Sequence, residues 1–229
     1  MANIFSGLES LGLGNLSGLE IFSDDEAKKK QEAGAASAPV VLKEEDLVYD
    51  KTYKCPCCDK QFTSKVVKTG KNKLRKSDSD LRRLYETVDS TKYDTVVCPF
   101  CGYGCITKYF APLSSLQCKL IKESISKTFK GIPEYGPVYS YQEAMARYKL
   151  ALVSTVVKKG KSSEKAYCAL KLSWLTRSFA ESLTDAPADV KLKAMLAEEE
   201  IEYEKIGSSD ISSDYEYFSC RLQYIKIER

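Results

Sequence analysis

Apolar and polar residues follow one pattern in the first half of the chain and another in the second half. Before residue 112 the apolar positions form short runs, and the runs Phe62–Val67 and Tyr93–Val97 predict β-strands. After Pro112 apolar residues recur every three or four positions, which predicts amphipathic helices. We therefore expect an α+β protein whose strands precede its helices.

Local signals mark where these helices begin and end. Ser140 and Glu143 form a capping-box pattern, in which each side chain bonds the backbone N–H of the other residue. Gly131 and Pro133 end the preceding helix, and Pro187 suits the first turn of a later one. The five predicted helical stretches are residues 116–129, 140–155, 163–182, 187–200 and 213–225.

The N-terminal 46 residues have a composition that predicts no packed core. Ser-Gly-Leu-Glu occurs at residues 6–9 and again at residues 17–20, a spacing that would place both copies on one side of a helix. Residues 1–22 are either a docking segment that folds on a partner or an unstructured tail, because four glycines weaken such a helix. The Ala-, Ser- and Gly-containing residues 23–46 predict a linker.

Composition excludes several classes of catalytic site. The 229 residues include no histidine, which rules out Ser-His-Asp triads, Cys-His pairs and histidine-ligated zinc. The nine cysteines are odd in number, and no signal peptide precedes them. No stretch approaches the roughly 18 apolar residues of a membrane helix. These observations predict a cytoplasmic protein with reduced thiols and no membrane contact.

Two pairs of cysteines predict a metal centre. Two residues separate Cys55 from Cys58 and likewise Cys98 from Cys101, and a proline follows the first cysteine of each pair. At this spacing one tight turn points both sulfur atoms at a metal, so the two turns together supply the four thiolates of a structural zinc site. Two such turns joined by strands form a zinc ribbon. We therefore expect one structural zinc ion per chain, with no coordination position left for water.

Three details of the cysteine pattern leave alternatives open. Cys57 lies inside the first pair and could replace Cys55 or Cys58 as a ligand. The 39 residues between Cys58 and Cys98 are about double the usual ribbon spacing, and pairs of this kind can also be redox thiols. Cys105, four residues after Cys101, is either a thiol that supports the metal ligands or a buried small residue. The remaining cysteines share no common spacing and are expected to be ordinary thiols: Cys118, Cys168 and Cys220.

The segment between the cysteine pairs is strongly basic. Residues 51–180 hold 25 Lys and Arg against 10 Asp and Glu, a net charge of +15, whereas residues 1–50 and 181–229 each carry −6. Within residues 60–83, nine Lys and Arg accompany two Asp. This surplus would suit the phosphates of nucleic acid, although lysine runs are usually solvated surface.

A polar cluster follows this basic run. Its members are Asp78, Asp80, Arg82, Arg83, Tyr85 and Asp94. In an extended chain Asp78, Asp80 and Arg82 would share one face. The cluster is either a ligand or phosphate site, with Asp78, Asp80, Arg82 and Tyr85 as its candidate residues, or a set of buried ion pairs that holds the insert against the ribbon.

The combination of these motifs resembles the bacterial domain of unknown function 2225 family. The similar segments lie within residues 50–182: Cys55 to Cys58, Ser77 to Arg82, Tyr93 to Tyr103, Ala146 to Leu152 and Trp174 to Arg177. The resemblance implies a zinc-ribbon-like module followed by helices similar to tetratricopeptide repeats, in cytoplasmic bacterial proteins. It implies no reaction, because the family has none assigned.

These inferences favour a zinc-binding, non-enzymatic adaptor that binds an unidentified protein partner through its helices. Its expected parts are a tail and linker (1–46), a zinc-ribbon-like module with the basic insert (47–111) and a tetratricopeptide-like helical domain (112–229). One alternative is a nucleic-acid-associated zinc-ribbon factor that uses residues 60–83. A second is an enzyme or ligand-binding protein that uses the cluster of Asp78, Asp80 and Arg82, although the sequence indicates no small-molecule substrate.

Overall fold

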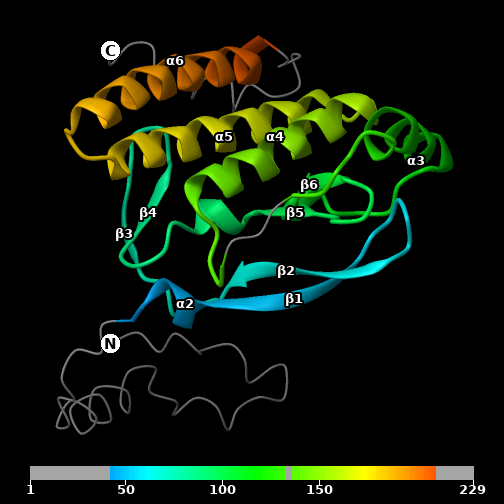
Figure 1. The fold of residues 1–229 in the computed structure, drawn as a ribbon, viewed down its shortest axis with the longest axis horizontal. Coiled ribbons are helices and arrows are strands. Elements are labelled where there is room, and N and C mark those ends of the chain that lie inside the picture. Colours follow the sequence, from blue (N-terminus) through cyan, green and yellow to red (C-terminus); the bar gives the residue numbers. More distant parts are fainter. Residues whose placement is uncertain (1–41, 133–135, 210–229) are drawn as a thin grey trace, which may run out of the picture. The chain divides into compact units, whose positions relative to one another are not determined.

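The computed structural model describes residues 42–132 and 136–209, which belong to one compact unit (Figure 1). Three predictions fall outside the described residues: the docking segment at residues 1–22, the fifth helix at residues 213–225 and the ordinary thiol of Cys220. The elements are α2 (Glu44–Leu47), β1 (Val48–Lys54), β2 (Gln61–Val67), β3 (Leu74–Ser77), β4 (Arg83–Tyr85), the 3₁₀ turn η3 (Ser90–Tyr93), β5 (Thr95–Val97), β6 (Gly104–Ile106), the 3₁₀ turn η4 (Thr107–Tyr109), α3 (Ser115–Ile121), the π-helical turn η5 (Lys122–Ser126), α4 (Tyr141–Val157), α5 (Ser162–Ser182) and α6 (Pro187–Ser209).

Within the described residues, the strands form three antiparallel two-stranded sheets. The longest pairs β1 with β2 without interruption, from Val48 opposite Val67 to Lys54 opposite Gln61. The strand predicted at Phe62–Val67 is thus confirmed as β2. The β3–β4 pair contains an irregularity after Leu74, and β5 pairs with β6.

The strand predicted at Tyr93–Val97 is wrong in its first two residues. Tyr93 ends the 3₁₀ turn η3 and Asp94 caps it, so that β5 begins only at Thr95. The Asp89 carboxylate accepts the Thr91 N–H at 3.0 Å, and the Asp94 N–H donates to the Thr91 carbonyl at 3.3 Å. These turn hydrogen bonds satisfy the backbone groups that a longer strand would have paired.

The helices follow their predicted positions closely. The capping box at the start of α4 is confirmed: Glu143 N–H donates to Ser140 Oγ at 3.2 Å, and Ser140 N–H donates to Glu143 Oε2 at 2.8 Å. Helix α5 confirms the third predicted stretch, and α6 confirms the start of the fourth but continues to Ser209, beyond the predicted end at residue 200. The first predicted helix, residues 116–129, ends earlier than expected. Helix α3 ends at Ile121, and the π-helical turn that continues it ends at Ser126.

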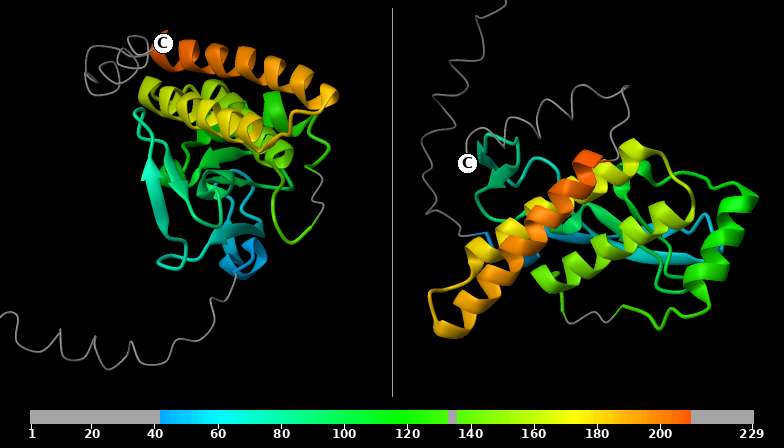
Figure 2. Two further views of the ribbon diagram at one scale, coloured as in Figure 1. Left: turned by 90° about the vertical axis from the view of Figure 1, so that its left-hand side faces the viewer. Right: turned by 90° about the horizontal axis from the view of Figure 1, so that it is seen from above.

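Helices α4, α5 and α6 are stacked on one side of the strands. Helix α6 packs on α5, α5 on α4, and α4 on strands β5 and β6, while the β1–β2 hairpin lies on the side away from α6 (Figures 1 and 2). Gly104 permits the approach of β6 to α4, since a Cβ atom there would lie 2.9 Å from the Ala151 backbone nitrogen. None of the helices in the described part of the chain is long and apolar enough to cross a membrane.

Three buried apolar clusters connect these elements. The first surrounds the cysteine pairs and includes Ile121 and Ile125 from the α3 segment. The second fills the space between α4, α5 and α6 and contains Ile106 from β6. The third joins Leu47 and Val88 near the β1–β2 hairpin. Strands and helices therefore share apolar cores, and the division of the chain at residue 111 stays a prediction.

Candidate metal centre

The two cysteine pairs lie at the tips of two β-hairpins that have the same backbone geometry. The Cys55 N–H donates to the carbonyl five residues later at 3.0 Å, and the Cys55 carbonyl accepts the N–H four residues later at 2.9 Å. Cys98 makes the same two bonds, at 2.9 and 3.0 Å. The residue after each second cysteine has a positive φ, 60° at Asp59 and 72° at Gly102. The repeated Cys-Pro-x-Cys pattern therefore encodes one turn twice.

These two turns bring four sulfur atoms together. The Sγ atoms of Cys55, Cys58, Cys98 and Cys101 all lie within 4.8 Å of one another. The Cys55–Cys101 and Cys58–Cys98 sulfur pairs are each 3.6 Å apart. Four sulfurs placed about 2.3 Å from a zinc ion in a tetrahedron are about 3.8 Å apart. The cluster thus has the ligand set and the size of a four-thiolate zinc site.

Burial and mutual hydrogen bonding shape the ionisation of these thiols. Cys55 and Cys98 are fully buried, and Cys101 is 5% exposed. Hydrogen bonds with Cys101 and Cys55 lower the pKa of Cys98 to about 2, whereas hydrogen bonds with Cys55 and Cys98 raise the pKa of Cys101 far above its ordinary value. Sulfurs this close cannot all ionise without a counter-charge, because neighbouring thiolates repel one another. A divalent cation would supply that charge.

Cys57 lies outside the cluster of four. Its thiol points to the Cys118 carbonyl oxygen at 3.8 Å, and the Cys118 thiol donates to the Pro56 carbonyl at 3.4 Å. The group of sulfur atoms that could hold a metal ion does not include the Cys57 Sγ. The two thiols instead hold α3 against the first hairpin. Cys105 is fully buried.

Comparison with known proteins places these features in a family. A sequence model for the family described as "Uncharacterized protein conserved in bacteria (DUF2225)" matches residues 48–218, which include both cysteine pairs and helices α3 to α6. The chain belongs to this family. No curated protein and no solved structure matches it. The resemblance inferred from the sequence motifs is therefore confirmed, and the match extends beyond residue 182.

The polar cluster in this DUF2225 chain is divided by the fold. Arg82 is buried, and its guanidinium binds Asp78 at 2.7 Å and Glu181 of α5 at 2.7 Å. Asp80 is also buried and accepts Nη1 of Arg177, again from α5, at 2.7 Å. Asp80 and Arg82 therefore form ion pairs that attach the insert to helix α5, whereas Asp78 pairs with Arg82 inside the insert.

The chain through this cluster is not extended, so the shared face that an extended chain would give does not form. The Asp78 N–H donates to the Arg82 carbonyl at 2.9 Å, and Leu81 has a φ of 65°, so the segment is a tight turn. The turn separates Tyr85 from the ion pairs. Tyr85 lines a cavity instead, together with Arg83 and Asp94.

The basic insert is likewise divided among several environments. Lys71, Lys73, Arg75 and Lys76 are exposed on and beside β3. Three cations of the insert have partners: Lys76 Nζ lies 3.8 Å from Asp78 Oδ1, Lys65 Nζ lies 6.0 Å from the Tyr139 ring centroid, and Lys68 Nζ donates to the Asp46 carbonyl at 2.8 Å.

Sequence reasoning missed the helical partners of the polar cluster. Arg177 binds Asp80 from the insert and also Glu200 and Glu204 from α6, with Nε 2.7 Å from Glu200 and Nη2 3.3 Å from Glu204. One feature of the sequence could have indicated that Arg177 forms an ion pair. Apolar and small residues flank Arg177 in a predicted helix, and a buried arginine requires a carboxylate partner. Nothing in the spacing identifies that partner.

Proposed function

We propose that this chain is a zinc-binding, cytoplasmic adaptor protein without enzymatic activity. The observation that carries the proposal is the cluster of four cysteine sulfurs within 4.8 Å of one another. Cys55, Cys58, Cys98 and Cys101 would hold one zinc ion. A shell closed by four thiolates leaves no position for a reacting water, so the ion would stabilise the fold. It would join two hairpins that are separated by 39 residues in the sequence.

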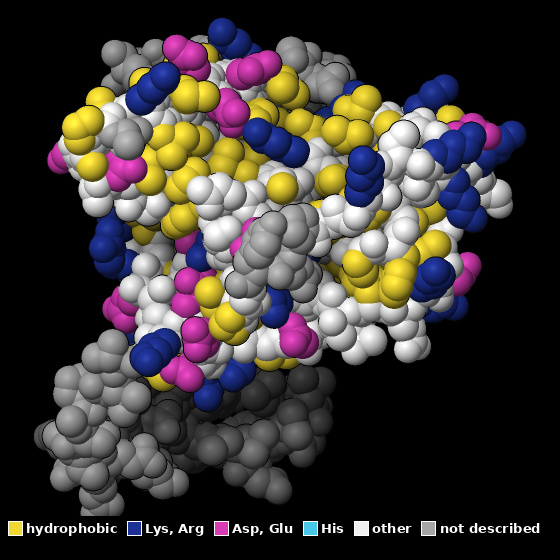
Figure 3. Space-filling model, in the orientation of Figure 1, with side chains coloured by type: hydrophobic (Ala, Val, Ile, Leu, Met, Phe, Trp, Pro, Cys, Tyr) yellow, Lys and Arg dark blue, Asp and Glu magenta, His cyan; other side chains and the backbone are white. Residues whose placement is uncertain are grey.

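The helices would present the partner surface in a tetratricopeptide-like arrangement. Val153 and Val156 are 50% and 55% exposed on α4, and Val190 and Met195 are 53% and 56% exposed on α6. Figure 3 shows hydrophobic side chains gathered over the region of α5 and α6. Exposed apolar side chains on stacked helices are the kind of surface that binds a peptide or a helix of a partner.

The metal assignment is tested by zinc content. Protein purified under reducing conditions should contain about one zinc ion per chain. The Cys98→Ser variant removes one thiolate and should lose the ion and expose residues 50–110 to protease, because the metal contributes folding energy. Cys118→Ser is the matched control, since this thiol lies beside the first hairpin but outside the cluster. Full zinc content and an unchanged digestion pattern in Cys98→Ser would contradict the assigned ligands.

The adaptor role is tested by site-specific cross-linking in cells. A photoreactive amino acid at position 156 on α4 or position 195 on α6 should give a discrete adduct with one partner protein, because both side chains are exposed and apolar in the structure. The same amino acid at Thr63, which is exposed on β2, is the control. Adducts as abundant from position 63 as from the helices, or none from the helices, would contradict an interaction surface there.

The exposed cations beside β3 favour nucleic acid as a second candidate partner. Counterion release makes such binding strongly salt-dependent. We expect weak binding that disappears near physiological salt. Replacing Lys71, Lys73, Arg75 and Lys76 by Ala should reduce the slope of log affinity against log salt by about 3 to 4. Tight, sequence-selective binding at physiological salt would instead make nucleic acid the leading candidate.

A further inference from the structure

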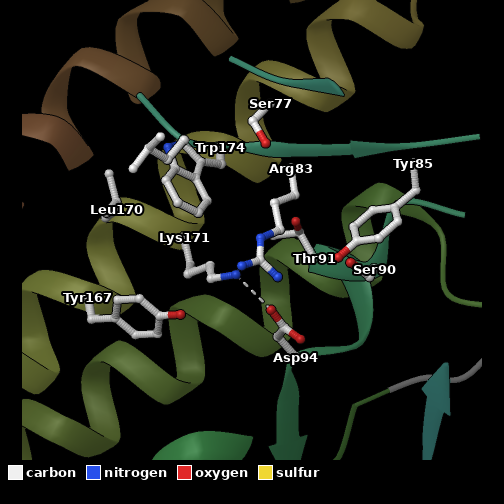
Figure 4. A pocket seen from close by; sticks show the side chains of 11 residues that line it. Ser77, Arg83, Tyr85, Ser90, Thr91, Asp94, Tyr167, Leu170, Lys171 and Trp174 are labelled. Carbon is white, nitrogen blue, oxygen red and sulfur yellow. Dashed lines mark hydrogen bonds and ion pairs between the residues drawn. The ribbon is translucent and has the colours of Figure 1, made fainter. Parts of the chain in front are cut away.

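A cavity of about 530 Å³ lies between the β3–β4 hairpin, the turn η3 and helix α5 (Figure 4). Its volume is within the range of about 300 to 1,000 Å³ that is typical of small-molecule sites. None of the four clustered cysteines lines it. Polar side chains from all three elements converge on this space, so its walls indicate the chemistry of a ligand.

One wall is a single face of the hairpin. Ser77 of β3 is paired with Arg83 of β4, and Tyr85 lies two residues after Arg83. Because side chains alternate along a strand and paired residues share a face, these three side chains lie on the same side of the hairpin. Within residues 42–132 and 136–209, the Arg83 guanidinium and the Tyr85 hydroxyl have no hydrogen-bond or ion-pair partner. Both groups are therefore available to a ligand.

The opposite wall is one face of helix α5. Tyr167, Leu170, Lys171 and Trp174 are spaced at i, i+3, i+4 and i+7, and all four line the cavity. The Lys171 ammonium lies 2.8 Å from Asp94 Oδ2, and 5.7 and 5.2 Å from the ring centroids of Tyr167 and Trp174. Burial lowers the pKa of Lys171, but the Asp94 carboxylate together with Tyr167 and Asp89 outweighs this and raises the pKa above its ordinary value. Lys171 is thus a fixed cation.

The charges in the cavity favour an anionic ligand. Figure 4 shows the ends of Arg83, Lys171 and Asp94 pointing toward one another. Asp94 neutralises Lys171, so Arg83 adds a positive charge that is not compensated within the lining. A guanidinium offers parallel N–H donors that match the oxygens of a phosphate or a carboxylate. The Asp94 side chain is 39% exposed and can also accept a hydrogen bond from a ligand hydroxyl.

We propose that this cavity binds a small ligand that carries a phosphate or carboxylate on a hydroxylated body, about the size of a sugar phosphate or a mononucleotide. The anion pairs with Arg83 and accepts a hydrogen bond from the Tyr85 hydroxyl, and the body of the ligand lies against Ser90 and Asp94. The proposal goes beyond the adaptor function and does not depend on it, because the cavity and the metal cluster share no residue.

Trp174 gives a direct readout of binding, since it lines the cavity and is the single tryptophan in the chain. The probes are the anions AMP, glucose 6-phosphate and galacturonate, each titrated beside its uncharged counterpart, adenosine, glucose or galactose. Fluorescence titration is repeated by calorimetry. We expect at least one anion to bind with a Kd of about 1 mM or below. The Kd of its uncharged counterpart should be higher by about tenfold or more.

Two exposed arginines of the insert supply the variant and its control. Arg83→Gln removes the charge that faces the cavity and should weaken binding of that anion about tenfold or more. Arg75→Gln removes a charge from the same hairpin but outside the cavity lining, so it should bind as the unaltered protein does. The proposal is overturned if no anion gives a saturable signal below about 10 mM, or if Arg83→Gln leaves the affinity unchanged.

Discussion

Replacement of Arg177 by methionine tests the ion-pair network that joins the insert to helices α5 and α6. The Arg177 guanidinium lies 2.7 Å from Asp80, 2.7 Å from Glu200 and 3.3 Å from Glu204. The Asp80 side chain is 3% exposed and that of Glu200 is 9% exposed. Methionine keeps most of the apolar stem of the side chain, but it removes the guanidinium that pairs with these two buried carboxylates.

The expected cost follows from this burial. Removing one partner of a buried ion pair costs about 3 to 5 kcal/mol. Asp80 keeps a hydrogen bond from the Arg82 N–H at 3.2 Å, and this bond offsets part of the loss. We therefore expect Arg177→Met to lower the free energy of unfolding by about 4 kcal/mol.

Urea unfolding in the presence of zinc measures this loss. Lys149→Met is the matched control, because Lys149 also links two helices through a carboxylate, Glu199, but their side chains are 47% and 39% exposed. An exposed pair of this kind contributes less than about 1 kcal/mol. Adding Asp80→Asn to the Arg177→Met variant should recover about half of the loss, since it removes one uncompensated charge. The reasoning is refuted if Arg177→Met costs no more than Lys149→Met, or if the added Asn recovers nothing.

Two further substitutions examine the packing of α4. Glu164→Gln removes the carboxylate that lies 2.5 Å from the buried Lys158 ammonium, and it should lower the free energy of urea unfolding by about 3 kcal/mol. A loss below about 1 kcal/mol would contradict a buried pair. Gly104→Ala places a methyl group 2.9 Å from the α4 backbone and should cost about 1 to 3 kcal/mol in thermal unfolding. Gly136→Ala, which meets nothing within 4 Å, is its control, and equal losses would contradict the close approach.

The cysteine cluster could be predicted because each half of it is encoded locally. The turn at Cys55 and the turn at Cys98 each form through backbone hydrogen bonds within six residues. The 39 residues between the pairs therefore do not disturb either turn. The capping box at Ser140 is local in the same way, which is why the start of α4 was predictable. The turn η3 was missed because its Asp89 cap lies outside the apolar run that predicted a strand.

The partners in the ion pairs and the walls of the cavity could not be predicted, because they are distant in sequence. Asp80 and Arg177 are 97 positions apart, and Arg82 and Glu181 are 99 positions apart. No spacing rule connects such residues until the hairpin docks on α5. The same holds for the cavity, whose walls come from separate elements. The sequence therefore offered Tyr85 as a candidate ligand residue, but it did not show that Tyr85 faces helix α5 across a cavity.

The fold gives the long insert a role that its sequence does not show. Counted along the sequence, residues 60–83 form one basic run, but Arg82 is buried against Glu181 and Arg83 faces the cavity. The net charge of residues 60–83 is therefore larger than the charge that a binding partner such as nucleic acid could contact at one surface. Arg82 and Asp80 hold the β3–β4 hairpin on α5, and no clustered cysteine takes part in these contacts. Separate sets of contacts thus build the cavity and the metal centre, so loss of the metal need not abolish the ligand site.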